Sequence, residues 1–343
     1  MNILRLSARP VARFAGGIRA GSGVWHLERI ETRRCFSVDS SVVGIWGSLS
    51  NSTPVAYCQQ ALVDLHDLSG LPWWASIILS TVLLRTVVTM PLAIYQNKIV
   101  ARLEKISLEM PDIVKQLKME TAVAMKKFHW SEKEARIMYN HSLKKQWNNL
   151  VVRENCHPAK TMILLWGQIP LWVMMSVSIR NMVHMLPDPG SIEAQITFTE
   201  LTLGGFGWIP NLTEVDQSLI LPVAMGLINL TIIEIQSAAR TREPSRLQKI
   251  FTNMFRGLSV LMIPVAATVP SCLCLYWVTS SACGLGQNLL LMSPRFKRLV
   301  GVPLVPSEIA RPYQHIKATF SSRFDALLAK HSSYLSNSAS LVE

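Results

Sequence analysis

The chain has 343 residues, of which 49% are hydrophobic and only 16% are charged, and its formal net charge is +12. Soluble domains carry about 25% charged residues, so this composition excludes an ordinary soluble globular protein and favours a membrane protein with basic loops. Aromatic residues are not interleaved with the basic clusters, which argues against nucleic acid as a partner.

The first 36 residues have the composition of a targeting segment. They contain seven arginines, no lysine and two acidic residues, which is typical of a mitochondrial transit peptide. Arg34, Phe36 and Ser37 resemble a matrix-processing site, with cleavage expected near Phe36. The alternative is a basic arm that binds nucleic acid.

Four apolar blocks follow, at residues 71–94, 161–182, 218–236 and 257–291. A helix needs roughly 20 residues to cross a bilayer, so each of the first three blocks predicts one span. The fourth is too long for one span, and Pro264 and Pro270 interrupt it. We therefore expect two helices there, and five spans in an all-α membrane protein.

The charges of the connecting segments alternate as five spans require. Residues 38–70 and 185–217 contain acidic residues and no lysine or arginine, whereas residues 95–158, 237–256 and 292–343 are basic. The positive-inside rule then places the mature N-terminus in the intermembrane space and the C-terminus in the matrix. The expected order is a transit peptide (1–36), an intermembrane-space segment (37–70), a first span (71–94), a matrix helical hairpin (95–158), a second span (159–184), an intermembrane-space loop (185–217), a third span (218–236), a matrix loop (237–256), a fourth span (251–269), a fifth span (272–291) and a partly disordered matrix tail (292–343).

The largest basic segment has a helical pattern of its own. Apolar residues recur every three or four positions, at Ile99, Leu103, Ile106, Met110, Ile113 and Leu117. Pro111 predicts a kink or a break in this helix, and Ser131 with Glu134 predicts a capping box that opens a second helix through about Val152. With a turn near residues 128–130, the two helices would form a hairpin that packs on itself, presents a docking surface for nascent chain or lipid, or does both.

Polar residues inside the apolar blocks indicate a functional site within the membrane. Arg85 lies well inside the first span, where a charge costs about 2.5–3.5 kcal/mol, and such residues normally face the interior of the bundle or a wet cavity. Thr81 and Thr89 lie one turn to either side of Arg85. Further uncharged polar groups occur in the other spans, at Gln168, Asn229, Tyr276, Ser280, Cys283 and Gln287.

One basic residue among neutral polar groups predicts a wet groove that attracts an anionic or polar peptide. The alternative is that Arg85 only bonds neighbouring carbonyl groups and holds helices together, and each threonine taken singly is expected to bond backbone. Glu234 could pair with Arg85. Exposure of its carboxylate near the matrix end of its span would cost less free energy than burial, so we favour exposure.

The sequence carries no catalytic motif, and we expect no metal and no cofactor. The six cysteines include no CxxC pair. Cys272 and Cys274 are two residues apart, so on a helix they would point to different faces.

Several motifs in order resemble the YidC/Alb family of membrane protein insertases, over roughly residues 65–295. They are Thr81-x3-Arg85 with Met90-Pro91-Leu92, Asn155-Cys156-His157-Pro158 with Gln168-Ile169-Pro170, Trp208-Ile209-Pro210-Asn211-Leu212-Thr213 with Asp216 and Ile220-Leu221-Pro222, Val269-Pro270-Ser271, Leu275-Tyr276-Trp277 and Gln287-Asn288. Within the family the chain is most similar to the mitochondrial inner-membrane branch dedicated to cytochrome c oxidase assembly.

The resemblance implies a five-helix core with a hydrophilic groove open to the matrix and to lipid. Arg85 matches the groove arginine of the family, Thr81 a polar position one turn away, and Tyr276 and Trp277 aromatic residues along the substrate path. The implied activity is insertion without covalent chemistry, and the implied client is the acidic C-terminal domain of cytochrome c oxidase subunit 2. Newly made mitochondrially encoded proteins, lipid and other oxidase assembly factors are the expected partners.

The tail departs from the pattern of ribosome-tethered members, because it has only about 50 residues and is weakly basic. We therefore do not expect stable ribosome binding. Two other functions stay open: an assembly scaffold that translocates nothing, and a small-solute transporter, although the chain shows no internal repeat of the kind transporters carry.

Overall fold

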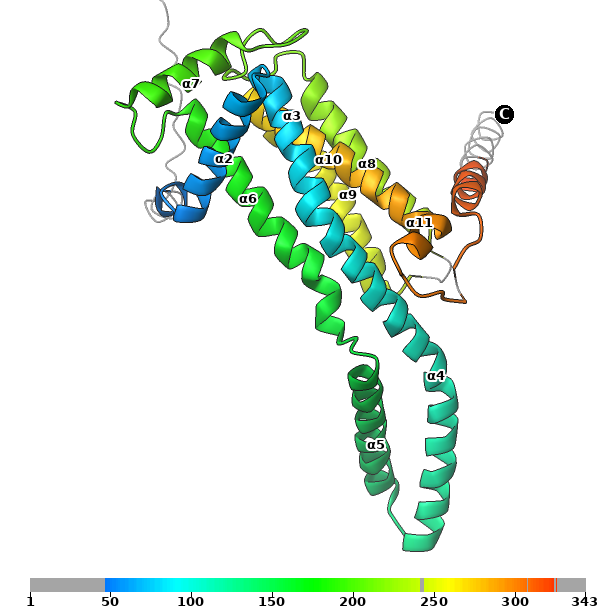
Figure 1. The fold of residues 1–343 in the computed structure, drawn as a ribbon. Coiled ribbons are helices and arrows are strands. Elements are labelled where there is room, and N and C mark those ends of the chain that lie inside the picture. The colour runs from blue at the N-terminus through cyan, green and yellow to red at the C-terminus, as the bar shows by residue number, and fades with distance from the viewer. Residues whose placement is uncertain (1–46, 241–243, 307, 324, 326–343) are drawn as a thin grey trace, which may run out of the picture. The chain divides into compact units, whose positions relative to one another are not determined.

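The computed structural model describes residues 47–240, 244–306, 308–323 and 325, which belong to one compact unit. The described residues form helices and no β-strand, so the all-α prediction is confirmed (Figure 1). The transit peptide, the processing site and the last 18 residues of the tail lie outside the described residues. The elements are α2 (Thr53–Ser69), α3 (Trp73–Leu84), η1 (Arg85–Thr89), α4 (Met90–Phe128), α5 (Glu132–Arg153), η2 (Pro158–Met162), α6 (Ile163–Val183), α7 (Ile192–Leu203), α8 (Ile220–Ala238), α9 (Arg246–Ala266), α10 (Ser271–Met292) and α11 (Pro294–Leu299).

Three of the described helices are long and apolar enough to cross a membrane. They cover Trp73–Phe128, Pro158–Val183 and Ile220–Ala238, where the first three apolar blocks lie. The fourth block holds two helices, α9 and α10, but neither meets the same criterion. The first half of α9 carries several charged and amide side chains, and α10 is rich in serine, glycine and amide residues. The count of five spans therefore stays a prediction.

The first span does not end where the apolar block ends. The chain runs from α3 through η1 into α4 as one helical segment of 56 residues. Of the kink or break predicted at Pro111, the break is wrong, because α4 continues through this residue, and the kink stays a prediction. A proline inside a helix costs about 3 kcal/mol, and here Met110 and Ile113 on either side of it pack into the cluster that joins α4 to α5.

The predicted hairpin forms from α4 and α5. The apolar stripe of α4 packs on Leu150 and Trp147 of α5, with Ile99 and Ile106 buried at the centre of the cluster. Ser131 and Glu134 make the predicted capping box, in which each side chain bonds the backbone of the other residue. The hairpin therefore packs on itself, and its use as a docking surface stays a prediction.

Replacing Ser131 with alanine should speed amide hydrogen exchange in the first turn of α5 by roughly fivefold, since an N-cap typically stabilises a helix by about 1 kcal/mol. Hydrogen bonds from Ser131 lower the pKa of the Glu134 carboxyl. The cap is therefore complete above the ordinary glutamate pKa and is lost as the pH falls through the lowered value. Ser142→Ala, in the middle of α5, is the matched control, and equal exchange in the two variants would contradict the prediction.

Two helices were missed in the acidic segments, although both have local signals. Pro54 lies in the first turn of α2 and Gly70 ends this helix in the left-handed conformation. Ser191 caps α7 by accepting a hydrogen bond from the Ala194 amide. The start of α9 was also predicted five residues too late, because Ser245 and Gln248 form a second capping box.

The main hydrophobic core lies where several helices meet at one end of the bundle. It contains the first turns of α3, α8 and α10, the last turns of α6 and α9, and the loop that follows α7. Leu212 of this loop is fully buried, and its carbonyl accepts a hydrogen bond from the Cys272 amide at 3.0 Å. The loop thus ties α7 to the start of α10.

Candidate functional site

Arg85 lies at a local change of helix geometry. Residues 85–89 form a π-helical turn, in which the amide of Met90 bonds the carbonyl of Arg85 five residues earlier. Single π-turns inside α-helices are frequent at functional sites. The Arg85 side chain is buried, with 9% of the residue exposed.

The partners of Arg85 come from α10. The hydroxyl oxygen of Ser280 accepts hydrogen bonds from Nε at 3.1 Å and from Nη2 at 2.6 Å, and Nε2 of Gln287 donates to the Arg85 carbonyl at 2.8 Å. Gly284 lies between these two residues, and a Cβ built there would stand 3.7 Å from Nη1 of Arg85. No acidic side chain pairs with Arg85 among the described residues. The guanidinium therefore lies among neutral groups.

A small cavity adjoins the guanidinium. Arg85, Thr89, Gln168, Tyr276 and Ser280 are among its lining residues, and its volume is about 10 Å³. A cavity of this size holds about one water molecule. The cavity beside Arg85 is too small to hold a peptide, so the polar groove stays a prediction.

The other predicted residues divide between the site and the packing around it. The hydroxyls of Thr81 and Thr89 donate to backbone carbonyls of their own helical segment. Nε1 of Trp277 donates to the hydroxyl of Ser176 at 3.0 Å, which holds α10 against α6. Asn229 of α8 does not line the cavity beside Arg85.

Two residues of the site were missed in the sequence. Trp172 lines the cavity and stacks on Trp277, with ring centroids 5.5 Å apart. Gly284 lies four residues after Ser280, so it continues the polar stripe of α10 at helical spacing. The same spacing could have found both residues, since Trp172 lies four residues after Gln168 on α6.

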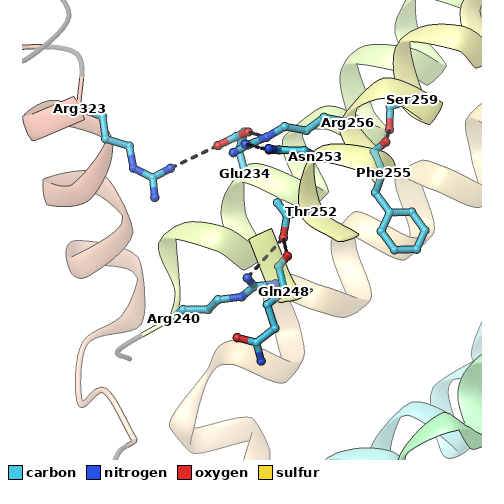
Figure 2. A network of polar contacts seen from close by, with 9 residues as sticks. All are labelled: Glu234, Arg240, Gln248, Thr252, Asn253, Phe255, Arg256, Ser259 and Arg323. Carbon is cyan, nitrogen blue, oxygen red and sulfur yellow. Dashed lines mark hydrogen bonds and ion pairs between the residues drawn. The ribbon is translucent and has the colours of Figure 1, made fainter. Parts of the chain in front are cut away.

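Glu234 lies in a separate polar network at the end of α8 (Figure 2). Its carboxylate pairs with Arg256 of α9 at 2.6 Å and with Arg323, in the helix formed by residues 312–323, at 3.3 Å. Its side chain is about one-third exposed. The alternative that Glu234 pairs with Arg85 is therefore wrong. Its partly exposed position agrees with the expectation of exposure near the end of its span.

Titratable groups just beyond the spans have shifted pKa values. Burial raises the pKa of the Cys156 thiol, where α5 leads into η2. Burial, aided by the charge of Arg180, lowers the pKa of His184 at the end of α6. Among the described residues, no three His, Cys, Asp or Glu side chains are grouped so that they could hold a metal ion.

Comparison with known proteins identifies the family. The family described as 60Kd inner membrane protein matches residues 64–298. Cytochrome c oxidase assembly protein COX18 of Mus musculus is 45% identical over 289 residues, which cover 84% of this chain and 86% of that protein. Its Homo sapiens counterpart is 42% identical over 82% of this chain and 83% of its own length.

A more distant relative is mitochondrial inner membrane protein OXA1 of Arabidopsis thaliana. It is 26% identical over 253 residues, which cover 74% of this chain and 53% of that protein. The family match spans more than half of the chain and includes Arg85 and its partners on α10. This chain therefore belongs to the 60Kd inner membrane protein family, the YidC/Oxa1 family of membrane insertases.

Proposed function

We propose that this chain is an insertase of the mitochondrial inner membrane that moves the hydrophilic C-terminal part of cytochrome c oxidase subunit 2 across the membrane for complex IV assembly. The mouse and human relatives are named as mitochondrial assembly proteins for this oxidase. The arginine-rich first 36 residues support import into mitochondria.

The observation that carries the proposal is the buried guanidinium of Arg85, which has no carboxylate partner among the described residues. A charge inside a membrane is costly, so an arginine kept there marks a functional site by default. Ser280 satisfies part of its hydrogen-bonding capacity. An acidic segment of a client would supply the missing negative charge and would itself be stabilised while it crosses.

The site must open to admit a peptide, because the cavity holds about one water molecule in this conformation. Arg85 lies on the helical segment of the first span, Gln168 and Trp172 on α6, and Tyr276 and Ser280 on α10. Separation of α6 from α10 would widen the cavity without breaking the bonds between Arg85 and Ser280. The open form would shorten the apolar distance that client charges must cross.

We also propose that α9 and α10 complete a core of five spans. They have 21 and 22 residues, and each is long enough to cross a bilayer. The basic segments 95–158 and 292–343 and residues 237–245 would then share the matrix side, and the acidic segments 38–70 and 185–217 would face the intermembrane space. The hairpin of α4 and α5 would receive newly made chains on the matrix side.

The narrow cavity favours one alternative, a scaffold that holds oxidase subunits without moving any segment across the membrane. Both functions use contacts with oxidase subunits and lipid. They differ in whether a client passes the Arg85 cavity, and this difference can be measured by crosslinking.

A photo-crosslinking residue at Tyr276 should capture newly made oxidase subunit 2 in intact mitochondria that are labelled during translation. The crosslink should disappear when mitochondrial translation is blocked. The same residue at Leu227, which is exposed on α8, is the control and should capture lipid. Crosslinks from Tyr276 to mature, assembled subunits alone would favour the scaffold, and the absence of any protein crosslink would contradict both functions.

A further inference from the structure

Helix α7 carries an apolar stripe that no described part of the chain covers. Ile192, Ile196 and Leu203 are 75%, 52% and 79% exposed. They are four and seven residues apart, so they share one face of the helix. Thr199 lies on the same face, and its hydroxyl is satisfied by the Gln195 carbonyl at 2.8 Å.

The rotation of α7 about its axis is set by contacts on its other faces. Leu201 is buried in the main core. Nε1 of Trp73 donates to the Glu200 carboxylate at 2.8 Å, and His66 stacks on Trp73 with ring centroids 4.1 Å apart. The Leu212 amide bonds the Leu201 carbonyl at 3.2 Å. These contacts hold the apolar stripe on the side of α7 that faces away from the core.

The same contacts place α7 at the end of the membrane spans. Trp73 is the first residue of one span, Val183 the last residue of the next and Ile220 the first residue of the third. All three ends border the same core, and α7 lies across them rather than along a span (Figure 1). Trp74 packs on Phe206, and Phe206 packs on Trp208, which is half exposed. Tryptophans gather at the membrane–water interface, so this cluster marks the depth of the interface beside Leu203.

We propose that α7 is an interfacial helix whose face of Ile192, Ile196 and Leu203 lies in the lipid of the leaflet where α3 and α8 begin. An amphipathic helix in the plane of the interface buries its apolar face at the boundary between headgroups and acyl chains. This inference needs only that α3, α6 and α8 cross the membrane. It does not depend on the proposed client.

The charges near α7 indicate which force holds it there. Residues 185–217 contain five acidic residues and no lysine or arginine. Many interfacial helices use basic residues to bind anionic headgroups, and α7 cannot. Its contact with the leaflet is therefore apolar and should be insensitive to salt and to anionic lipid.

Spin labels on single introduced cysteines test the proposal in the full chain, reconstituted at low density in phosphatidylcholine vesicles. Ile196→Cys and Leu203→Cys probe the stripe. Glu193→Cys, on another exposed face of α7, is the matched control, and Leu227→Cys on α8 is the lipid-facing reference. The spectrum of the parent chain is subtracted to remove the signal of its own cysteines.

Labels at residues 196 and 203 should collide with oxygen as often as the label at 227 and should lose collisions with a water-soluble nickel chelate. The label at 193 should keep its nickel collisions. Neither added salt nor phosphatidylglycerol should change these results. Nickel collisions at 196 and 203 equal to those at 193 would overturn the proposal, as would labels shielded from both reagents, because a second copy of the chain would then cover the stripe.

Discussion

Replacing Arg85 with alanine should reduce insertion of the subunit 2 C-terminal domain by roughly ten- to hundredfold. Hydrogen bonds to a charged group contribute about 1.5–3 kcal/mol, and each 1.36 kcal/mol in a barrier changes a rate tenfold. Arg85→Lys keeps the charge but loses the two bonds that Nε and Nη2 share with Ser280. We expect this variant to retain more activity than the alanine variant. Protease protection of newly labelled subunit 2 in mitochondria measures the insertion rate.

Variants of two residues beside Arg85 distinguish the effect of its charge from the effect of its packing. Ser280→Ala removes the acceptor and leaves the guanidinium, so its effect should be smaller than that of Arg85→Ala. Gly284→Leu would place a bulky side chain against Nη1, because even a Cβ there lies 3.7 Å away. This variant should displace the guanidinium from its position while leaving its charge present. Insertion at the normal rate by a stably folded Arg85→Ala protein would contradict the proposed mechanism and favour the scaffold.

Replacing Gly205 with alanine should destabilise the fold by about 2–3 kcal/mol, within the range for overpacked positions. A Cβ at Gly205 would stand 2.2 Å from the carbonyl oxygens of Ile209 and Pro210. These are backbone atoms, so they can move away only if the loop shifts. Phe206 and Ile209 exchange two backbone hydrogen bonds in this loop, and such a shift would break them.

The effect should spread to α10, because Leu212 of the same loop bonds the Cys272 amide. Cys272 and Cys274 are fully buried and free, so their reaction with a maleimide dye during heating reports the loss of this packing. Gly257→Ala on α9 is the matched control, because nothing lies within 4 Å of a Cβ at that position. The prediction is contradicted if the two variants expose their thiols at the same temperature.

Much of the fold could be predicted because its signals are local. Runs of about 20 apolar residues predicted the positions of three spans, and Ser131 with Glu134 predicted the start of α5. The turn after Phe128 also followed from the pattern. The helices of the acidic segments could not be predicted in the same way, because α2 and α7 lack a long apolar run and a cap by itself does not establish a helix.

Which polar groups meet was decided by the tertiary structure. Arg85 and Ser280 are 195 residues apart in the chain and share two hydrogen bonds, whereas Asn229, predicted for the same site, lies elsewhere. The sequence alone determined the positions of the three apolar helices and the capping box of α5, since each depends on residues within a few turns. The tertiary structure decided the partners, the π-turn and the exposed face of α7. In a membrane, lipid-facing and protein-facing sides of a helix are almost equally apolar, so only the packing of distant helices separates them.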